Sequence, residues 1–117
     1  MKKAFTLPTC KTCQRIFDDL NPEKNGCEII NIKERGVSRE ELDAMKVLTG
    51  SYEALFSRRA MKFRSLNLKE KTLSDDDYRT LILGEYTFLK RPVFLFDDAV
   101  TVGSRKSEIE KARELLR

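Results

Sequence analysis

The spacing of apolar residues at the start of the chain predicts a strand followed at once by a helix. Residues 3–7 form a short, mainly apolar run that Pro8 ends, which is typical of a strand. Farther on, apolar positions recur at intervals of three and four residues, the period of an amphipathic helix; they are Cys13, Ile16, Phe17 and Leu20. We therefore expect Cys10 at the N-terminus of this helix, with Cys13 one turn inside it and more deeply buried.

A turn and a second apolar run complete a β-α-β beginning. Residues 21–26 read Asn-Pro-Glu-Lys-Asn-Gly, which is rich in turn formers, and residues 27–32 are again mostly apolar. Cys27 opens this second predicted strand. We expect it to be a buried thiol of the sheet, the alternative being a regulatory or third redox role.

Two capping sequences predict helices in the middle of the chain. Residues 38–41 (Ser-Arg-Glu-Glu) and 74–77 (Ser-Asp-Asp-Asp) each place an acidic residue three positions after a serine, as in a capping box. The helices that follow should end at Gly50 and near Gly84. A further short helix is expected over residues 52–56.

The last part of the chain predicts a hairpin and a final helix. Two short apolar runs, 93–96 and 99–102, are joined by two aspartates, and residues 104–116 carry one apolar stripe at helical spacing. The order β-α-β, several helices, β-β-α predicts one α/β domain over residues 1–117, interrupted by a helical insert at about residues 38–88. A chain of this length can bury the core of one domain.

Charge is spread along the chain rather than gathered in a tail. The 117 residues include 23 Lys and Arg and 19 Asp and Glu, a formal net charge of +4. Such a distribution falls short of a nucleic-acid signature, and an anionic small molecule or an acidic protein patch fits as well. No apolar run approaches membrane-spanning length, and the residues before Pro8 are too few for the apolar core of a signal peptide. We expect a cytoplasmic monomer that contacts no membrane and binds no nucleic acid directly.

The strongest chemical signal is the Cys-x-x-Cys formed by Cys10 and Cys13 between the first strand and helix. A helix N-terminus carries unpaired N–H groups and partial positive charge, which lower a thiol pKa below its free value of about 8.5. This position therefore favours Cys10 as the attacking thiolate. Cys13 would then resolve the mixed disulfide that results.

Two other interpretations of these cysteines stay open. Tetrahedral zinc needs four ligands, and a chain with three cysteines and no histidine could supply only part of a site shared between chains. The two thiols could also be inert. The strand, turn and helix around them favour redox chemistry, and the odd cysteine count does not fit a fully paired secreted framework. We therefore expect no metal and no bound cofactor.

Four short segments, taken in order, resemble the arsenate reductase family of thioredoxin-like proteins, which also contains the Spx transcriptional regulators. They are Pro-Thr-Cys-Lys-Thr-Cys at 8–13, Ala-Leu-Phe-Ser-Arg-Arg at 54–59, Leu-Lys-Arg-Pro-Val at 89–93 and Val-Gly at 102–103. The resemblance spans nearly the whole chain. It implies a thioredoxin-like mixed sheet with an inserted helical segment, and it implies that Cys10 is the nucleophile.

The resemblance also implies an anion-binding role for arginines. Arg59 and Arg91 match the family's basic positions, where guanidinium groups hold an oxyanion near the thiolate. Arg58 is the alternative to Arg59 for the arginine that points inward. Pro92 matches the proline that is cis in thioredoxin-like proteins and would bring backbone beside Cys10.

The chain departs from the glutaredoxin-dependent arsenate reductases at two positions. Those enzymes lack a cysteine three residues after the nucleophile, where this chain has Cys13, and they carry a further arginine where this chain has Gly103. Arg105, two residues on, is the candidate substitute. Thiol chemistry is therefore better supported than arsenate as the substrate.

Two functions follow from the resemblance. The first is an oxidoreductase acting on a small oxyanion or a disulfide, with glutathione, glutaredoxin or thioredoxin as the external reductant. The second is an Spx-like regulator that binds RNA polymerase and senses redox state through a Cys10–Cys13 switch.

Overall fold

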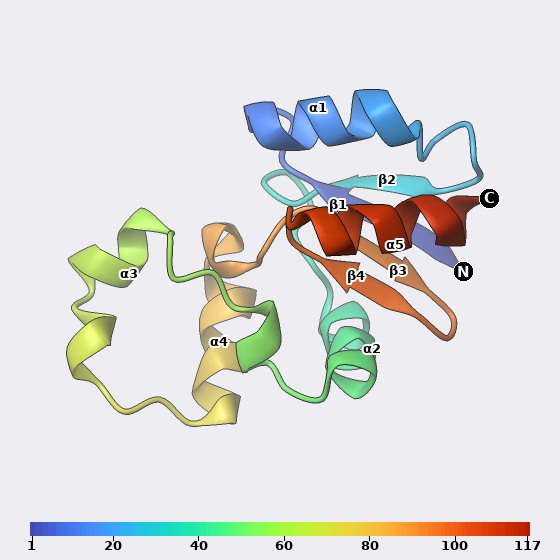
Figure 1. Cartoon of the computed structure of the whole chain (residues 1–117). Coiled ribbons are helices and arrows are strands. Elements are labelled where there is room, and N and C mark those ends of the chain that lie inside the picture. The colour runs from blue at the N-terminus through green and yellow to red at the C-terminus, as the bar shows by residue number, and fades with distance from the viewer. The chain divides into compact units, whose positions relative to one another are not determined.

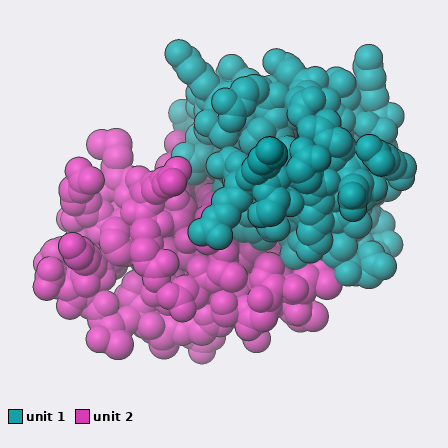
Figure 2. Space-filling model, in the orientation of Figure 1, with its two compact units in different colours: residues 1–36, 91–117 teal, residues 37–90 magenta.

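The computed structural model describes all residues, 1–117, and divides them into two compact units (Figure 2). Unit 1 contains residues 1–36 and 91–117, and unit 2 contains residues 37–90. The helical insert expected at about residues 38–88 falls within unit 2. That the whole chain forms one domain stays a prediction. No helix is long and apolar enough to cross a membrane.

Unit 1 is a four-stranded mixed sheet with two helices (Figure 1). Its elements are β1 (Lys2–Thr6), α1 (Lys11–Leu20), β2 (Glu28–Asn31), β3 (Val93–Phe96), β4 (Val100–Val102) and α5 (Lys106–Leu116). The strand order is β2-β1-β3-β4, with β1 parallel to β2 and the other two pairs antiparallel. The β-α-β beginning, the hairpin and the final helix predicted from the sequence are confirmed.

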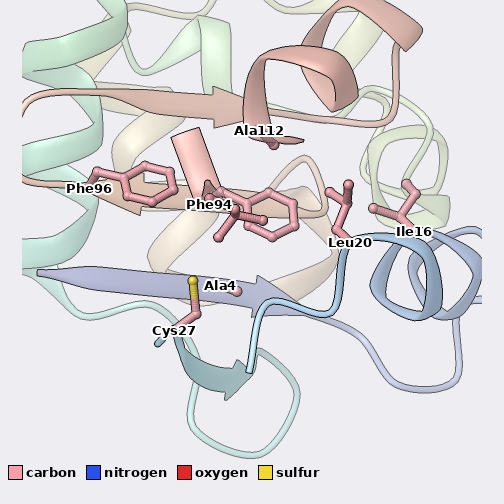
Figure 3. Close-up of a cluster of buried hydrophobic side chains, with 8 residues drawn as sticks. Ala4, Ile16, Leu20, Cys27, Phe94, Phe96 and Ala112 are labelled. Atoms are coloured by element: carbon pink, nitrogen blue, oxygen red, sulfur yellow. The ribbon is translucent and has the colours of Figure 1, made fainter. Parts of the chain in front are cut away.

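The core of unit 1 joins one face of the sheet to α1 and α5 (Figure 3). Strand residues Ala4 and Phe94 and helix residues such as Ile16 and Ala112 belong to the same buried cluster. The rings of Phe17 and Phe94 lie 5.5 Å apart at their centroids. Successive strand residues point to opposite faces of the sheet, so Ala4, Phe94 and Phe96 reach this cluster from one face, although β3 is buried along its whole length. This packing fixes α1, and with it both thiols, above β1.

Unit 2 consists of short helices connected by turns. They are α2 (Arg39–Thr49), the 3₁₀ helix η1 (Glu53–Leu55), α3 (Met61–Ser65), the 3₁₀ helix η2 (Leu68–Glu70), α4 (Asp75–Gly84) and the 3₁₀ helix η3 (Tyr86–Phe88). Both capping boxes form, at Ser38 and at Ser74, as predicted. The helix expected over residues 52–56 is the single turn η1. Helix α3 was not predicted, because its five residues include none that is buried and so show no amphipathic period.

Aromatic and ionic contacts hold unit 2 together. The Phe56 ring stacks on Phe88 with centroids 4.9 Å apart and meets the edge of Tyr78 at 4.8 Å. Between α2 and α4, Asp43 accepts hydrogen bonds from Arg79 Nε at 2.9 Å and from the Tyr52 hydroxyl at 2.6 Å. These two donors, Arg79 first, lower the pKa of Asp43 to about 2.

We expect Ser38→Ala to lower the free energy of unfolding by about 1 kcal/mol, the usual cost of removing an N-cap hydroxyl. The Ser38 Oγ accepts from Glu41 N–H at 3.1 Å, and the Glu41 carboxylate accepts from Ser38 N–H at 2.9 Å. Urea unfolding followed by circular dichroism measures the change. Ser104→Ala is the matched control, since Ser104 is exposed and caps no helix. Equal stabilities of the two variants would contradict the prediction.

Candidate thiol site

A short loop between β1 and α1 carries Cys10. The Cys10 N–H donates to Leu7 O at 2.9 Å, and Cys10 O accepts from Gln14 N–H at 3.0 Å, which starts the helix. The Gln14 side-chain amide donates to Pro8 O and closes the loop from the other side. Cys10 is therefore the N-cap residue of α1, as the apolar spacing predicted.

The surroundings of the Cys10 sulfur favour the thiolate. Partial burial raises the pKa of Cys10, but four hydrogen bonds outweigh it and leave that pKa below its ordinary value. They come, in order of effect, from the Cys13 N–H, the Cys13 thiol, the Arg91 guanidinium and the Thr12 N–H. Two of these donors are backbone N–H groups of the first helical turn, which have no partner within the helix. Helix start and arginine therefore both favour the thiolate form of Cys10.

The Cys13 sulfur lies in the opposite environment. Its side chain is fully buried, and burial raises the pKa of Cys13 above its ordinary value. The Leu7 N–H and the Thr6 side chain form hydrogen bonds that lower this pKa, whereas the hydrogen bond and the negative charge of Cys10 raise it. All three cysteines are free thiols in the structure. One thiol is thus prepared to ionise while its neighbour keeps its proton.

Arg91 and Pro92 lie beside this pair in unit 1. Hydrogen bonding by the Arg91 guanidinium is one of the causes that lower the pKa of Cys10, and the Arg91 Nε is buried without a partner. The Arg91–Pro92 peptide bond is cis, as the resemblance implied. Pro92 O accepts from Gly103 N–H at 2.9 Å, which ties the start of β3 to the end of β4. A buried guanidinium N–H without an acceptor is a vacant donor for an anion.

The other arginines named from the sequence lie in different units, Arg58 and Arg59 in unit 2 and Arg105 in unit 1. Arg58 donates to the Glu53 carboxylate at 2.7 Å and to the Tyr78 hydroxyl at 3.1 Å, so it is occupied within unit 2. Arg59, also in unit 2, is exposed, and Arg105 is the exposed N-cap residue of α5 in unit 1. The anion-binding roles of Arg59 and Arg105 stay predictions.

Cys27 is buried just before β2, as expected of a sheet thiol. Burial raises the pKa of Cys27, and the positive charge of Lys2 partly offsets that rise. No three His, Cys, Asp or Glu side chains gather where they could hold a metal ion.

Sequence reasoning missed three residues that contact the thiol site. Gln14 braces the loop, and Thr6 and Leu7 donate to the Cys13 sulfur. Of these three residues, only Thr6 carries a signal in the sequence, because it is a polar residue on the face of the strand that α1 covers. The Leu7 N–H is a backbone group, and its approach to Cys13 depends on the docking of the helix.

These features define a thioredoxin-like protein with a thiol site. They are the mixed sheet, its helices, and a cis proline beside a Cys-x-x-Cys at the start of a helix. Over residues 5–112 the sequence matches the ArsC family, and the chain belongs to that family. Among curated relatives, the uncharacterized protein YusI of Bacillus subtilis is 36% identical over 112 residues, which cover 92% of this chain and 93% of that protein. The global transcriptional regulator Spx 2 of Bacillus cereus is 28% identical over 92% of this chain and 82% of its own length.

Two solved structures show the same fold. An ArsC family related protein from Bacteroides fragilis superimposes with a TM-score of 0.82 over 99% of this chain and 97% of that one, at 24% identity. The arsenate reductase from Vibrio cholerae superimposes with a TM-score of 0.78 over 94% of this chain and 95% of that one, at 19% identity. The two solved structures thus show that this chain shares the fold of an arsenate reductase, and its relatives in sequence include Spx regulators.

We expect Cys10 to react with iodoacetamide at pH 7 well before Cys13 and Cys27, because only its pKa is lowered and both other thiols are buried. Peptide mass spectrometry of briefly labelled, folded protein measures the three rates. Labelling in urea, where the environments are lost, is the control and should make the rates similar. Equal rates in the folded protein would remove Cys10 from the role of nucleophile.

Proposed function

We propose that this protein is a thiol-dependent oxidoreductase in which the Cys10 thiolate attacks a small oxyanion or a disulfide. Arg91 holds the anionic part of the substrate, and Cys13 or an external thiol releases Cys10. Membership of the ArsC family supports this class of reaction. Glutathione, glutaredoxin or thioredoxin would return the protein to its reduced form.

The observation that carries the proposal is the pairing of Cys10 with Arg91. The guanidinium is close enough to lower the pKa of the Cys10 thiol, and its Nε is buried without an acceptor. A substrate oxygen bound by the half-buried Arg91 guanidinium would lie next to the attacking thiolate, where a fixed positive charge also stabilises the charge that develops. A purely structural arginine would instead be expected to satisfy all of its buried donors within the protein.

With both substrate classes, the first step is the formation of a bond to the Cys10 sulfur. With a disulfide, the Cys10 sulfur bonds to one substrate sulfur and the other leaves as a thiolate. With an oxyanion of the arsenate type, the Cys10 sulfur bonds to the central atom and one oxygen leaves as water. Attack by a second thiol on Cys10 then joins the two sulfurs. That step passes two electrons to the substrate and leaves a disulfide for the external reductant.

The alternative function is an Spx-like regulator that contacts RNA polymerase. It is favoured by the relatives named as global transcriptional regulator Spx, which match more than nine-tenths of this chain. In this function the Cys10–Cys13 pair would switch between dithiol and disulfide without turning over a substrate. Turnover that depends on Cys10 separates the two functions.

The direct test is arsenate-dependent oxidation of NADPH, coupled separately through glutathione with glutaredoxin and through thioredoxin. We expect activity with one donor system and its loss in Cys10→Ser. The Cys27→Ala variant is the matched control, because it removes a thiol remote from the proposed chemistry. Absence of turnover with both donors would exclude arsenate. The same assay with glutathione disulfide would then decide whether any oxidoreductase activity exists.

Anion binding by Arg91 can be tested with two alkylating reagents. Both need the same Cys10 thiolate, but iodoacetate carries a negative charge and iodoacetamide does not, so the ratio of their rates cancels any change in pKa. At low salt, we expect Arg91→Gln to lower this ratio by about fivefold, the equivalent of about 1 kcal/mol of attraction between nearby charges. The role that the family resemblance implies for Arg59 predicts the same direction for Arg59→Gln.

Arg58→Gln is the matched control for these variants. Arg58 is already held by Glu53 and Tyr78, so its loss should leave the reagent ratio unchanged. An Arg91→Gln ratio equal to that of the wild type would contradict anion binding by Arg91.

A further inference from the structure

Thr6 is a buried polar residue at the end of β1. Only 5% of it is exposed, and its backbone is fixed by the parallel pairing with Asn31 and by the Ile32 N–H, which donates to Thr6 O at 3.0 Å. A buried hydroxyl needs a hydrogen-bond partner. Hydrogen bonding by the Thr6 side chain is one of the causes that lower the pKa of the buried Cys13 thiol.

The alternation of β1 places Thr6 on the correct face independently of that hydrogen bond. Ala4 belongs to the cluster that contains Ile16 and Leu20 of α1, and Thr6, two residues later, must point to the same side of the sheet. On α1, Cys13 lies on the buried side together with Ile16 and Leu20. Strand period and helix period therefore place Thr6 and Cys13 on the facing sides of β1 and α1.

We propose that Thr6 is a positioning residue. Together with the N–H of Leu7, it stabilises the thiolate of Cys13 when Cys13 attacks Cys10. The inference rests on the proposed function, in which Cys13 resolves a bond formed by Cys10. It assigns to the end of β1 a role in the second step of the reaction, where the structure supplies two donors to one sulfur.

The contacts of Cys13 indicate at which step Thr6 and Leu7 can stabilise its thiolate. While Cys10 is a thiolate, its charge and its hydrogen bond oppose ionisation of Cys13. Once Cys10 has bonded to a substrate sulfur it carries no charge, and the donors Thr6 and Leu7 remain. Cys13 then loses its proton to solvent and attacks the Cys10 sulfur. The Cys10–Cys13 bond forms, and the substrate sulfur leaves as a thiolate.

The two steps can be separated with 5,5′-dithiobis(2-nitrobenzoate) in a Cys27→Ala background. Attack by Cys10 releases one thionitrobenzoate at a rate proportional to reagent concentration. Attack by Cys13 releases the second at a rate independent of it. Rapid mixing of wild type, Thr6→Val and Thr6→Ser gives both rates across pH 6 to pH 10. Val replaces the hydroxyl by a methyl group of similar size, so we expect Thr6→Val to stay folded, and thermal melting checks this. Thr6→Ala is a second variant that lacks the hydroxyl.

The expected change is confined to the second phase. A rise of one unit in the pKa of Cys13 reduces its thiolate about tenfold below that pKa but increases thiolate nucleophilicity about threefold, which leaves a slowing of about threefold at low pH. The slowing diminishes as the pH rises toward that pKa, because a growing fraction of the variant's Cys13 is then ionised as well. Thr6→Ser should restore the wild-type profile.

Each other result overturns the inference. A second phase in Thr6→Val with the wild-type pH profile, or slowed equally at every pH, would make Thr6 a packing residue only. So would a Thr6→Ser profile that matches Thr6→Val. If the wild type itself releases no second thionitrobenzoate, Cys13 does not resolve Cys10, and the inference fails together with that step of the proposed function. If the wild type releases thionitrobenzoate in two phases and the variants behave in the same way, the role of Thr6 is rejected while the proposed function stands.

Discussion

The packing of helix α1 on strand β1 is the contact on which the thiol site depends. Ala4 leaves room for the helix, and Ile16 and Leu20 fill that room in the same buried cluster. Because α1 cannot rotate without exposing these residues, Cys13 is held against the sheet and the first turn of the helix is held above the end of β1. The loop between them is then fixed by backbone and side-chain hydrogen bonds around Cys10.

From this one contact the two sulfurs acquire opposite properties. Cys10 is only partly buried and receives hydrogen bonds from free N–H groups of the helix start and from Arg91, so its pKa is lowered. Cys13 is fully buried a single turn later, so its pKa is raised even though the end of β1 donates to it. The two thiols belong to the same four-residue motif. Their chemical difference comes from depth below the surface and from which donors reach each sulfur.

Much of the architecture was predictable because each element carries a local signal. Capping boxes at Ser38 and Ser74 marked helices that form as expected, and the change to strand spacing near Val93 marked the hairpin. Helix α3 carried no such signal. It is short, and its residues stay at the surface, so nothing in its sequence required a helix. Of the candidate site, the position of Cys10 followed from spacing, whereas the contact of Arg91 with Cys10 joins residues far apart in the chain.

The sequence by itself determined the thiol motif, its place between a strand and a helix, and the greater burial of the second cysteine. These are local properties, set by apolar period and by the turn residues around Pro8. Only the tertiary structure decided which donors surround each sulfur, that Arg58 is occupied by Glu53 and Tyr78, and that Arg91 keeps a buried Nε without a partner. Those facts arise from contacts across strands and between distant segments. The spacing of residues along the chain does not predict such contacts. The chain contains many residues of the same type, and only the fold decides which of them reaches a given sulfur.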